Sequence, residues 1–233
     1  MTTNPTSPEE RTREPQYQRH LVLRDQIGLA RFGVMINEAW HQDPRRVLFV
    51  LARHKFVARM LAGKANVLEI GCADAFGTRL VQQEVGAVTA VDFDPVFIAD
   101  AEARADAHWP LTLRVHDLLQ GPVPGTFDAA YALDVLEHIN PADEDKFLTH
   151  AIAALSQQGV LILGMPSLES QAYASPQSRE GHVNCKSGPQ FRALMQRHFH
   201  NVFLFSMNDE VVHTGFQAMA HYLIAVCCGK RNA

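Results

Sequence analysis

The sequence has few cysteines and no long apolar run, and each lack excludes a class of protein. Its four cysteines, in 233 residues, show no spacing typical of a disulfide framework or a zinc site. The apolar runs Val160–Met165 and Tyr222–Cys228 fall far short of the roughly 18–20 residues that a membrane-spanning helix needs. The first twenty residues are polar and do not have the apolar core of a secretory signal. We therefore expect a reduced, cytoplasmic protein without a membrane span.

The sequence also has no excess of positive charge, with 21 basic against 25 acidic residues and a formal charge of −4. A nucleic-acid partner is therefore not expected, because no overall positive field would recruit one. One local exception is the segment 44–64, which holds basic residues and no acidic one. This segment is either a solvated helix face or a surface that binds phosphate beside an acceptor site.

The order of composition along the chain predicts three parts. Residues 1–20 are rich in proline, threonine and charge, which predicts a disordered tail. Helical patterns predict a helical cap over residues 21–64, with one helix at 21–40. A second helix is expected to begin at Asp43-Pro44, with Asp43 as its N-cap. The remainder, 65–233, is predicted to be the binding domain.

From residue 65, short apolar runs alternate with helical patterns. The predicted strands are 66–70, 87–91, 111–115, 127–133 and 159–163, and the predicted helices between them are 76–85, 95–107 and 143–156. This alternation predicts an α/β fold, doubly wound, with helices on both faces of a mostly parallel sheet. After a helix at 187–198, which opens with a capping-box spacing, the strands 200–206 and 219–227 have no helix between them. They are therefore expected to pair antiparallel.

The segment from Val67 to Thr78 runs from a strand through a turn of small residues into a helix. Exposed N–H groups at such a turn favour polar or anionic ligand atoms, although a turn that serves packing alone is the alternative. A nicotinamide-binding G-x-G-x-x-G would need glycine where Ala73 and Phe76 stand, which disfavours an oxidoreductase. Because Ala73 and Ala75 disfavour a positive φ, we predict that the turn has ordinary backbone conformations.

Carboxylates follow three of the predicted strands. Asp92 ends the second strand and could accept both hydroxyls of a ribose. Asp117 follows the third strand, at the edge where an adenine amino group could lie, and Asp134 follows the fourth strand. Each alone could be a solvated loop residue. Their repetition at successive strand ends indicates a single ligand site.

The strings VLEIGCADAFG, AVDFDP, VHDL and FDAAYALDVLEHI resemble the successive motifs of class I S-adenosylmethionine-dependent methyltransferases. The last string resembles the branch with ubiquinone-biosynthesis O-methyltransferases and many sugar and natural-product methyltransferases. The resemblance implies a Rossmann-like sheet of seven strands with an antiparallel last strand, and S-adenosylmethionine as cofactor. It places the methionine part at Gly71, the ribose at Asp92, the adenine at Asp117 and the sulfonium end at Leu133 and Asp134. The implied cofactor-binding residues are Glu69, Gly71, Cys72, Ala73, Asp92, Phe93, Asp117, Leu118, Leu133 and Asp134.

Two long connections, 166–186 and 207–217, are expected to overhang the carboxyl ends of the strands, and such loops are usually functional. They suggest general bases for a hydroxyl acceptor, in the order His182, His213 and then His138, which follows the fourth strand. A structural role is the alternative for each histidine. Polar groups that could contact the acceptor are Tyr173, Asn184 and Asn208. No metal site is expected, because the histidines are dispersed.

These observations predict methyl transfer from S-adenosylmethionine to a small-molecule, glycan or nucleotide-sugar acceptor, at oxygen rather than nitrogen. An N-methyltransferase and a donor-binding regulatory module without catalysis are the alternatives. A nucleic-acid methyltransferase is disfavoured, because no Asn-Pro-Pro-aromatic motif follows the fourth strand. The oligomeric state is open, with a homodimer as one alternative.

Overall fold

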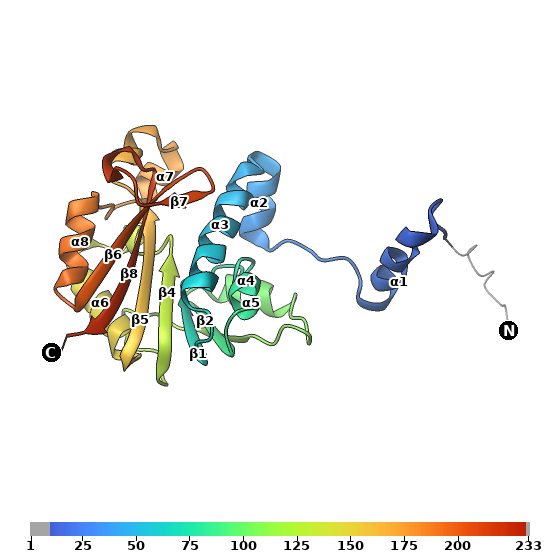
Figure 1. The fold of residues 1–233 in the computed structure, drawn as a ribbon, viewed down its shortest axis with the longest axis horizontal. Coiled ribbons are helices and arrows are strands. Elements are labelled where there is room, and N and C mark those ends of the chain that lie inside the picture. Colours follow the sequence, from blue (N-terminus) through green and yellow to red (C-terminus); the bar gives the residue numbers. More distant parts are fainter. Residues whose placement is uncertain (1–9, 232–233) are drawn as a thin grey trace. The chain divides into compact units, whose positions relative to one another are not determined.

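The structure, a computed structural model, describes residues 10–231 (Figure 1). The chain divides into two compact units, Met1–Phe32 and Gly33–Ala233. The first unit holds the 3₁₀ helix η1 (Pro15–Tyr17) and α1 (Gln18–Ile27). The predicted disordered tail falls partly on residues 1–9, outside the described residues, and its last residues belong to η1 and α1. The predicted domain boundaries at residues 20 and 64 remain predictions.

The single helix predicted at 21–40 is wrong, because two helices occupy this region. Helix α1 ends at Ile27, where Gly28 takes a φ of 76°, and α2 (Val34–Gln42) begins only after Gly33. A positive φ favours glycine and interrupts the helical hydrogen bonds. The next helix, α3 (Arg45–Met60), has Pro44 rather than Asp43 as its N-cap. The Asp43 carboxylate still accepts a hydrogen bond from the Arg45 N–H, at 3.2 Å.

The second unit is built on one sheet with the strand order β3-β2-β1-β4-β5-β8-β6-β7. Its strands are β1 (Asn66–Ile70), β2 (Ala87–Asp92), β3 (Thr112–Val115), β4 (Phe127–Leu133), β5 (Leu155–Pro166), β6 (Phe199–Asn208), β7 (Val211–His213) and β8 (Tyr222–Lys230). Strands β3, β2, β1, β4 and β5 are parallel, and β8 is antiparallel to both β5 and β6. The mostly parallel sheet and the antiparallel terminal pair are thus confirmed. The eighth strand is the short β7, which pairs with β6 inside the predicted loop 207–217.

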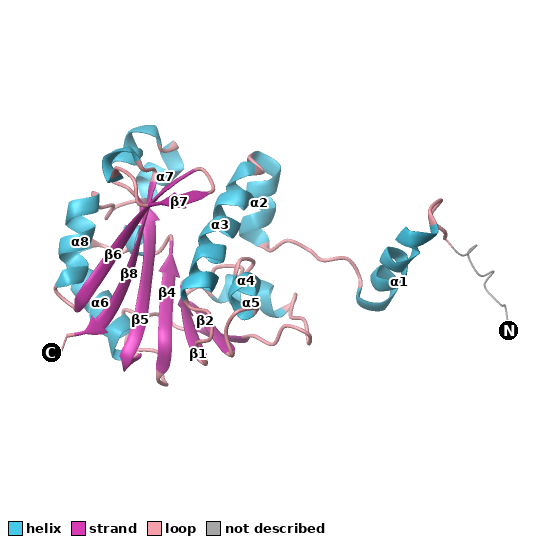
Figure 2. Ribbon diagram, viewed as in Figure 1, coloured by secondary structure: helices cyan, strands magenta, loops and turns pink. Residues whose placement is uncertain are grey.

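The helices between the strands are short (Figure 2). They are α4 (Thr78–Gln82), α5 (Pro95–Glu102), α6 (Glu144–Ala153), α7 (Pro176–Gly181) and α8 (Gly188–Gln196), with the 3₁₀ helices η2 (Leu136–His138), η3 (Pro141–Asp143), η4 (Glu169–Tyr173) and η5 (Gln217–Met219). The predicted capping box of Ser187 and Gln190 is present at the start of α8. The connection 166–186 contains η4 and α7. Within residues 10–231, no helix combines the length and apolarity needed to span a membrane.

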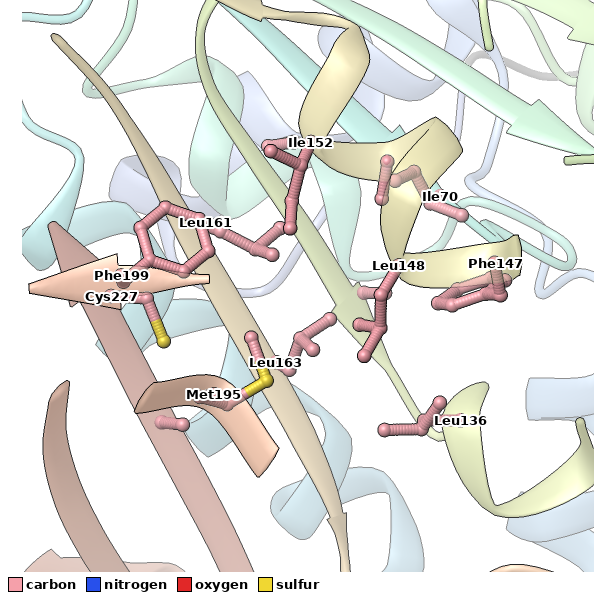
Figure 3. Close-up of a cluster of buried hydrophobic side chains, with 14 of the residues drawn as sticks. Ile70, Leu136, Phe147, Leu148, Ile152, Leu161, Leu163, Met195, Phe199 and Cys227 are labelled. Carbon is pink, nitrogen blue, oxygen red and sulfur yellow. The ribbon is translucent and has the colours of Figure 1, made fainter. Parts of the chain in front are cut away.

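Both faces of the sheet are buried against helices. On one face, Phe147 and Leu148 of α6 and Met195 of α8 pack on alternate residues of the central strands (Figure 3). On the other face, Val57 of α3 and Val81 of α4 pack on the remaining alternate residues. Helix α2 lies beside α3 (Figure 1). This double cover explains why the strands read as continuous apolar runs, and it leaves the ends of the strands as the place for a ligand.

The order of the strands fixes where that place is. Strand β1 has β2 on one side and β4 on the other, so the connections after β1 and β4 leave the sheet toward opposite faces. In open α/β sheets, ligands bind outside the carboxyl ends of the strands at this switch point. The residues that follow β1, β2, β3 and β4 are therefore the ones to examine.

Candidate functional site

The loop that follows β1 begins at Gly71, whose φ is 72°. A Cβ atom added at Gly71 would lie 2.4 Å from Cγ2 of Val135, so only glycine lets the loop pass the segment after β4. The N–H groups of Gly71 and Cys72 both donate to the carbonyl oxygen of Val91, at 2.8 and 3.0 Å. The loop is thus fixed at its start by β2 and by close packing on Val135.

The prediction that this loop has ordinary backbone conformations is wrong. Ala73 has a φ of 46° and Ala75 a φ of 52°, both in the left-handed region. Holding an L-residue there costs about 1–2 kcal/mol. Two hydrogen bonds oppose this cost: the Ala73 N–H donates to Oδ2 of Asp92 at 2.9 Å, and the Ala75 N–H donates to the Cys72 carbonyl at 2.8 Å. The loop therefore keeps a glycine-like course with alanine at both positions.

Asp92 ends β2 and is only 6% exposed. Besides the Ala73 N–H, it accepts the Asp94 N–H on Oδ1 at 2.9 Å. A carboxylate offers about four lone-pair positions, so these two bonds leave acceptor capacity for ribose hydroxyls. The next residue, Phe93, is 73% exposed and stands free at the strand end.

The third strand end is built in a similar way. Oδ1 of Asp117 accepts the Leu119 N–H at 2.8 Å, and Leu118 is buried in the core. The Asp117 side chain is half-buried, so it is within reach of a ligand. The carboxylates of Asp92 and Asp117 follow the neighbouring parallel strands β2 and β3, which places them at the same edge of the sheet.

Glu69, another predicted cofactor contact, is buried in β1 and bonded to two helices. Its Oε2 accepts a hydrogen bond from Oγ1 of Thr78 in α4 at 2.5 Å, and its Oε1 lies 3.3 Å from Nε2 of His54 in α3. The His54 ring stands edge-on to that of Tyr131. Burial and the neighbouring Glu69 raise the pKa of Tyr131 well above its usual range. Glu69 thus ties α3 and α4 to the strand beneath the loop.

One contact that the sequence did not suggest joins α2 to the loop. The buried carboxylate of Asp74 accepts the backbone N–H of Ile36, in the first turn of α2, at 2.9 Å. The guanidinium of Arg104 donates to the Asp74 carbonyl at 2.5 Å. Asp74 therefore holds the helix that precedes the sheet against the loop that follows its first strand.

Asp134 follows β4 and also has a positive φ, of 57°. Its N–H donates to the Gly164 carbonyl at 3.0 Å, and its Oδ2 accepts Nη1 of Arg53 at 2.6 Å. The Arg53 guanidinium lies 3.7 Å from the centroid of the Tyr222 ring, a cation–π geometry. This pair brings α3 over the predicted sulfonium end, beside Leu133, which is buried at the end of β4.

The Arg53–Asp134 ion pair is one of three that engage basic residues of the segment 44–64. Arg45 lies 2.8 Å from Asp43 and Arg59 lies 2.9 Å from Glu84, while Arg53 pairs with Asp134 as described. Three of the basic residues in this segment are therefore already neutralised by carboxylates of the chain. A phosphate-binding surface on α3 receives little support from this arrangement.

Beyond Asp134, the structure brings together three residues that the sequence left apart. Ligand atoms of Glu137, His138 and His182 lie within 4.8 Å of one another. The two imidazole rings are 5.1 Å apart, centroid to centroid. Nδ1 of His138 is 2.9 Å from the Gly181 carbonyl oxygen, and Nδ1 of His182 is 2.9 Å from Oε1 of Gln171. Because these oxygens only accept, the neutral form of each ring carries its proton on Nδ1 and keeps a lone pair on Nε2.

Glu137 is fully buried, and neither of its carboxyl oxygens has a hydrogen-bond partner within residues 10–231. Burial, and then the neighbouring Asp134, raise the pKa of Glu137 well above its usual range. The segment that covers it is anchored firmly. The Glu137 carbonyl accepts the Asn184 N–H at 3.0 Å, and the Asn184 side chain donates to Glu144 at 2.9 Å. The sequence placed Glu137 in a motif but assigned it no role.

The other predicted acceptor residues lie elsewhere. His213, in β7, accepts the Gly215 N–H on Nδ1 and therefore donates from Nε2 to Oδ1 of Asn208, each at 2.9 Å. Both of its nitrogens are thus engaged within its own hairpin. Tyr173 is 91% exposed. A hollow of about 330 Å³ lies beside His182, among Gln171, Arg179 and Cys185.

Comparison with known proteins finds related sequences. A family model described as a methyltransferase domain matches residues 67–159. A ubiquinone biosynthesis O-methyltransferase from Xanthomonas campestris pv. campestris is 27% identical over 156 residues, which cover 64% of this chain and 64% of that protein. A probable S-adenosylmethionine-dependent methyltransferase from Mycolicibacterium smegmatis is 27% identical over 119 residues, 49% of this chain and 44% of that protein. The match spans less than two thirds of these relatives' own length.

Solved structures share the fold. The N-methyltransferase NodS from Bradyrhizobium japonicum, in complex with S-adenosyl-L-homocysteine, has a TM-score of 0.58 at 20% identity and covers 82% of this chain and 91% of its own. A possible histamine N-methyltransferase from Thermotoga maritima has a TM-score of 0.63 at 15% identity and covers 83% of this chain and 94% of its own. At these identities the likeness concerns the fold.

The residues present fit S-adenosylmethionine. The close approach of Gly71 to Val135 allows no side chain at position 71, so the loop presents only backbone at this residue. Asp92 and Asp117 offer carboxylates where the nucleoside would lie. The domain and its relatives support an enzyme with this cofactor. Residues 67–159 therefore match a methyltransferase domain, and the resemblance of the chain to the class I S-adenosylmethionine-dependent methyltransferases is confirmed.

Proposed function

We propose that this chain transfers the methyl group of S-adenosylmethionine to a hydroxyl oxygen of a small-molecule acceptor. The observation that carries the proposal is the pair of imidazoles formed by His138, in the segment after β4, and His182, in the segment after β5. A hydroxyl is a weak nucleophile until its proton is removed, whereas an amine acceptor needs no residue beyond one that keeps it deprotonated. Two imidazoles with free Nε2 atoms are suited to the hydroxyl.

The position of the pair supports the same acceptor chemistry. The His182 ring lies 5.1 Å from that of His138, which follows Asp134 by four residues, and the resemblance places the sulfonium at Asp134. Methyl transfer is an in-line displacement, so the acceptor oxygen must lie opposite the leaving sulfur, and alignment contributes much of the rate. The hollow of about 330 Å³ beside His182 has the size of a small-molecule site. Gln171 and Arg179 line it together with apolar residues such as Leu168 and Val183, which suits an acceptor that carries both polar and apolar groups.

The proposal is tested by offering S-adenosylmethionine with a labelled methyl group to matched acceptors. Each pair would share one scaffold, such as a catechol against the corresponding aromatic diamine, or a hexose against the amino sugar. We expect labelled O-methyl product from the hydroxyl member, identified by mass spectrometry. Labelled N-methyl product alone would refute O-methylation. Tight donor binding without product from any acceptor would favour the donor-binding module instead.

A further inference from the structure

Three buried polar atoms near the start of β8 have no hydrogen-bond partner in the part of the chain that the structure describes. They are Nε of Arg53, Nε2 of His221 and the hydroxyl oxygen of Tyr222. Buried polar atoms in native proteins nearly always have a partner, and an unpaired one destabilises the fold. Several unpaired polar atoms in one place therefore indicate a ligand that pairs with them.

The three groups are neighbours. The guanidinium carbon of Arg53 lies 3.7 Å from the centroid of the Tyr222 ring, so the guanidinium covers one face of that ring. His221 directly precedes Tyr222, and its ring lies 5.7 Å from that of Phe49, which stands one helical turn before Arg53 in α3. Tyr222 is completely buried, and the Arg53 side chain is 13% exposed. The unpaired atoms thus lie together between α3 and the start of β8.

The protonation of these groups makes all three of them hydrogen-bond donors. Arg53 is a permanent cation. Nδ1 of His221 accepts the Asp209 N–H at 3.3 Å, so the neutral ring carries its proton on Nε2. Burial, and then the neighbouring Arg53, lower the pKa of His221 and keep the ring neutral. Burial, and then the charge of Asp134, raise the pKa of Tyr222 well above its usual range, so its hydroxyl keeps its proton.

These donors lie on the acceptor side of the expected position of the sulfonium. A Cβ atom added at Gly164, in β5, would lie 2.7 Å from Cδ2 of Leu133 and 2.8 Å from the Tyr222 hydroxyl oxygen. The hydroxyl therefore stands beside a residue at which the resemblance places the sulfonium. Strand β4 has β1, with the loop for the methionine part, on one side, and β5 and then β8 on the other. An in-line displacement requires the acceptor opposite the leaving sulfur, which is this second side.

We propose that Arg53, His221 and Tyr222 form a subsite for a carboxylate of the acceptor, which makes the substrate a hydroxy acid. Arg53 binds Asp134 through Nη1, which leaves the edge formed by Nε and Nη2 for a second carboxylate. A guanidinium edge binds a carboxylate through two parallel hydrogen bonds. Because Asp134 already balances one positive charge, a singly charged carboxylate suits the subsite better than a doubly charged phosphate.

A carboxylate in this subsite holds the acceptor at a second point. Its hydroxyl is the first point, beside the imidazoles of His138 and His182, and this assignment of the ligand rests on the proposed O-methylation. The subsite itself rests on the unpaired donors alone. An amide of the same shape places an NH2 group against these donors, and sites built to hydrogen-bond a substrate group reject analogues that lack it. The subsite therefore selects hydroxy acids over the corresponding amides.

The selection is tested with labelled S-adenosylmethionine and three matched pairs: salicylate and salicylamide, caffeate and caffeamide, and lactate and lactamide. We expect the acid of at least one pair to give a labelled methyl ether, with kcat/KM about 100-fold or more above that of its amide. Mass spectrometry identifies the product. A labelled methyl ester would place the carboxylate at the reacting position and overturn the subsite.

Tyr222→Phe separates binding from folding, because it keeps the ring beneath Arg53 and removes only the unpaired hydroxyl. We expect KM for the acid to rise about 10-fold with kcat little changed, and the melting temperature of the ligand-free protein to rise by about 2–4 °C. Ser206→Ala is the matched control, because the buried Ser206 hydroxyl donates to the Gly215 carbonyl at 3.1 Å. It should melt at a lower temperature with KM unchanged. The same result in Tyr222→Phe would show that its hydroxyl is structural and overturn the subsite.

Calorimetry distinguishes the acceptor from the donor, because S-adenosylmethionine also carries a carboxylate. Arg53→Gln should bind S-adenosylmethionine like the parent chain, which also shows that it has folded. Its affinity for the acids, measured with S-adenosylhomocysteine bound, should fall about 100-fold. Weaker binding of S-adenosylmethionine by Arg53→Gln, with unchanged binding of decarboxylated S-adenosylmethionine, would assign the subsite to the donor and overturn the proposal.

The outcomes separate the subsite from the reaction. Acid binding that Arg53→Gln and Tyr222→Phe both weaken, without a methyl ether from any acid, would support the subsite and refute the proposed O-methylation. Methyl ethers formed equally well from acids and amides would support O-methylation and overturn the subsite. Failure of the parent chain to bind any of the three acids would also overturn the subsite.

Discussion

The buried carboxyl groups beside the loop after β1 and the buried carboxyl group in the segment after β4 differ in their hydrogen bonding. Asp92 and Asp74 each accept backbone N–H groups and thereby hold the loop and α2 in place. Glu137, buried as deeply, has no hydrogen-bond partner within residues 10–231. A carboxylate that accepts backbone N–H groups fixes the chain around it, whereas one without a partner leaves all of its acceptor positions for a ligand. The comparison indicates a donor side that is preformed and an acceptor side that its ligand completes.

The largest effect is expected at the acceptor side. His182→Ala should lower turnover by about 10²–10⁴-fold, because it removes one of the two imidazoles that activate the acceptor. Donor affinity should be unchanged, since His182 belongs to the segment after β5 and is not among the residues implied to bind the donor. Steady-state turnover and donor calorimetry on the same preparation measure both. A larger loss of turnover in His213→Ala than in His182→Ala would assign acceptor activation to the β6–β7 hairpin.

The next largest effect is expected at the donor side. Asp92→Ala removes the acceptor of two N–H groups, those of Ala73 and Asp94, and should lower the affinity for S-adenosylmethionine by about 100-fold or more. Asp128→Ala is the matched control, because Asp128 also accepts two backbone N–H groups, those of Ala65 and Asn66, at the other end of β1. Both variants should lose stability, but only Asp92→Ala should lose the donor. Equal donor affinity in the two would contradict the preformed site.

A smaller effect is expected on the free energy of unfolding. Substitution of Glu137 should raise it, whereas the preceding substitutions each cause a loss. Glu137→Gln should raise the free energy of unfolding by about 1–3 kcal/mol at pH 8, because the amide requires neither a buried charge nor the uptake of a proton on folding. The pKa of Glu137 is raised in the fold, so the stability that its protonated form contributes is present below about pH 4.5 and lost as the pH rises. The gap between variant and parent should therefore widen from about pH 4.5 to pH 8.

Glu144→Gln provides the contrast. Glu144 is paired with Lys186 and accepts a hydrogen bond from Asn184, so neutralising it should lower stability. Thermal melting in the presence of a chelator measures both variants, at about 2–4 °C per kcal/mol for a chain of this size. If Glu137→Gln also melts at a lower temperature than the parent, Glu137 has a partner that stabilises it, and the contrast between the two sides fails.

The smallest effect is expected in the loop after β1. Ala73→Gly and Ala75→Gly should each raise stability by up to about 1 kcal/mol, because glycine takes a positive φ without steric cost. The matched control is Ala99→Gly, at an exposed position within α5, which should lower stability by about 1 kcal/mol. Thermal melting of the three variants makes the comparison. Destabilisation by all three would show that the loop is not strained at the alanines.

Much of the fold could be predicted from the sequence because its signals are local. The strand 66–70 and the strand 127–133 have the bounds that their apolar runs predict. The capping box at Ser187 was also correct. The error at 21–40 is local as well: the apolar pattern suggested one helix, but Gly28 and Gly33 divide it. The helix break depended on glycine conformations that the periodicity did not reveal.

Two features could not be predicted from local sequence patterns: the backbone of the loop after β1 and the meeting of His138 and His182. The backbone of Ala73 depends on a hydrogen bond to Asp92, which lies on another strand. The intrinsic preference of alanine predicted the opposite conformation, and a tertiary contact overrode it. Likewise, the spacing of the histidines along the sequence did not indicate that His138 and His182 lie together. His182 reaches His138 only because the segment after β5 folds back over the end of β4.

The sequence by itself determined the alternation of strands and helices, the antiparallel end of the sheet and the strand ends at which a nucleoside-type donor would bind. Apolar periodicity and turn residues act between neighbours in the chain, so they are readable from it. Only the tertiary structure decided the course of the loop at Ala73 and Ala75, the Arg53–Asp134 pair and the meeting of Glu137, His138 and His182. These features join residues far apart in sequence, and their energies exist only once the sheet and its loops have assembled.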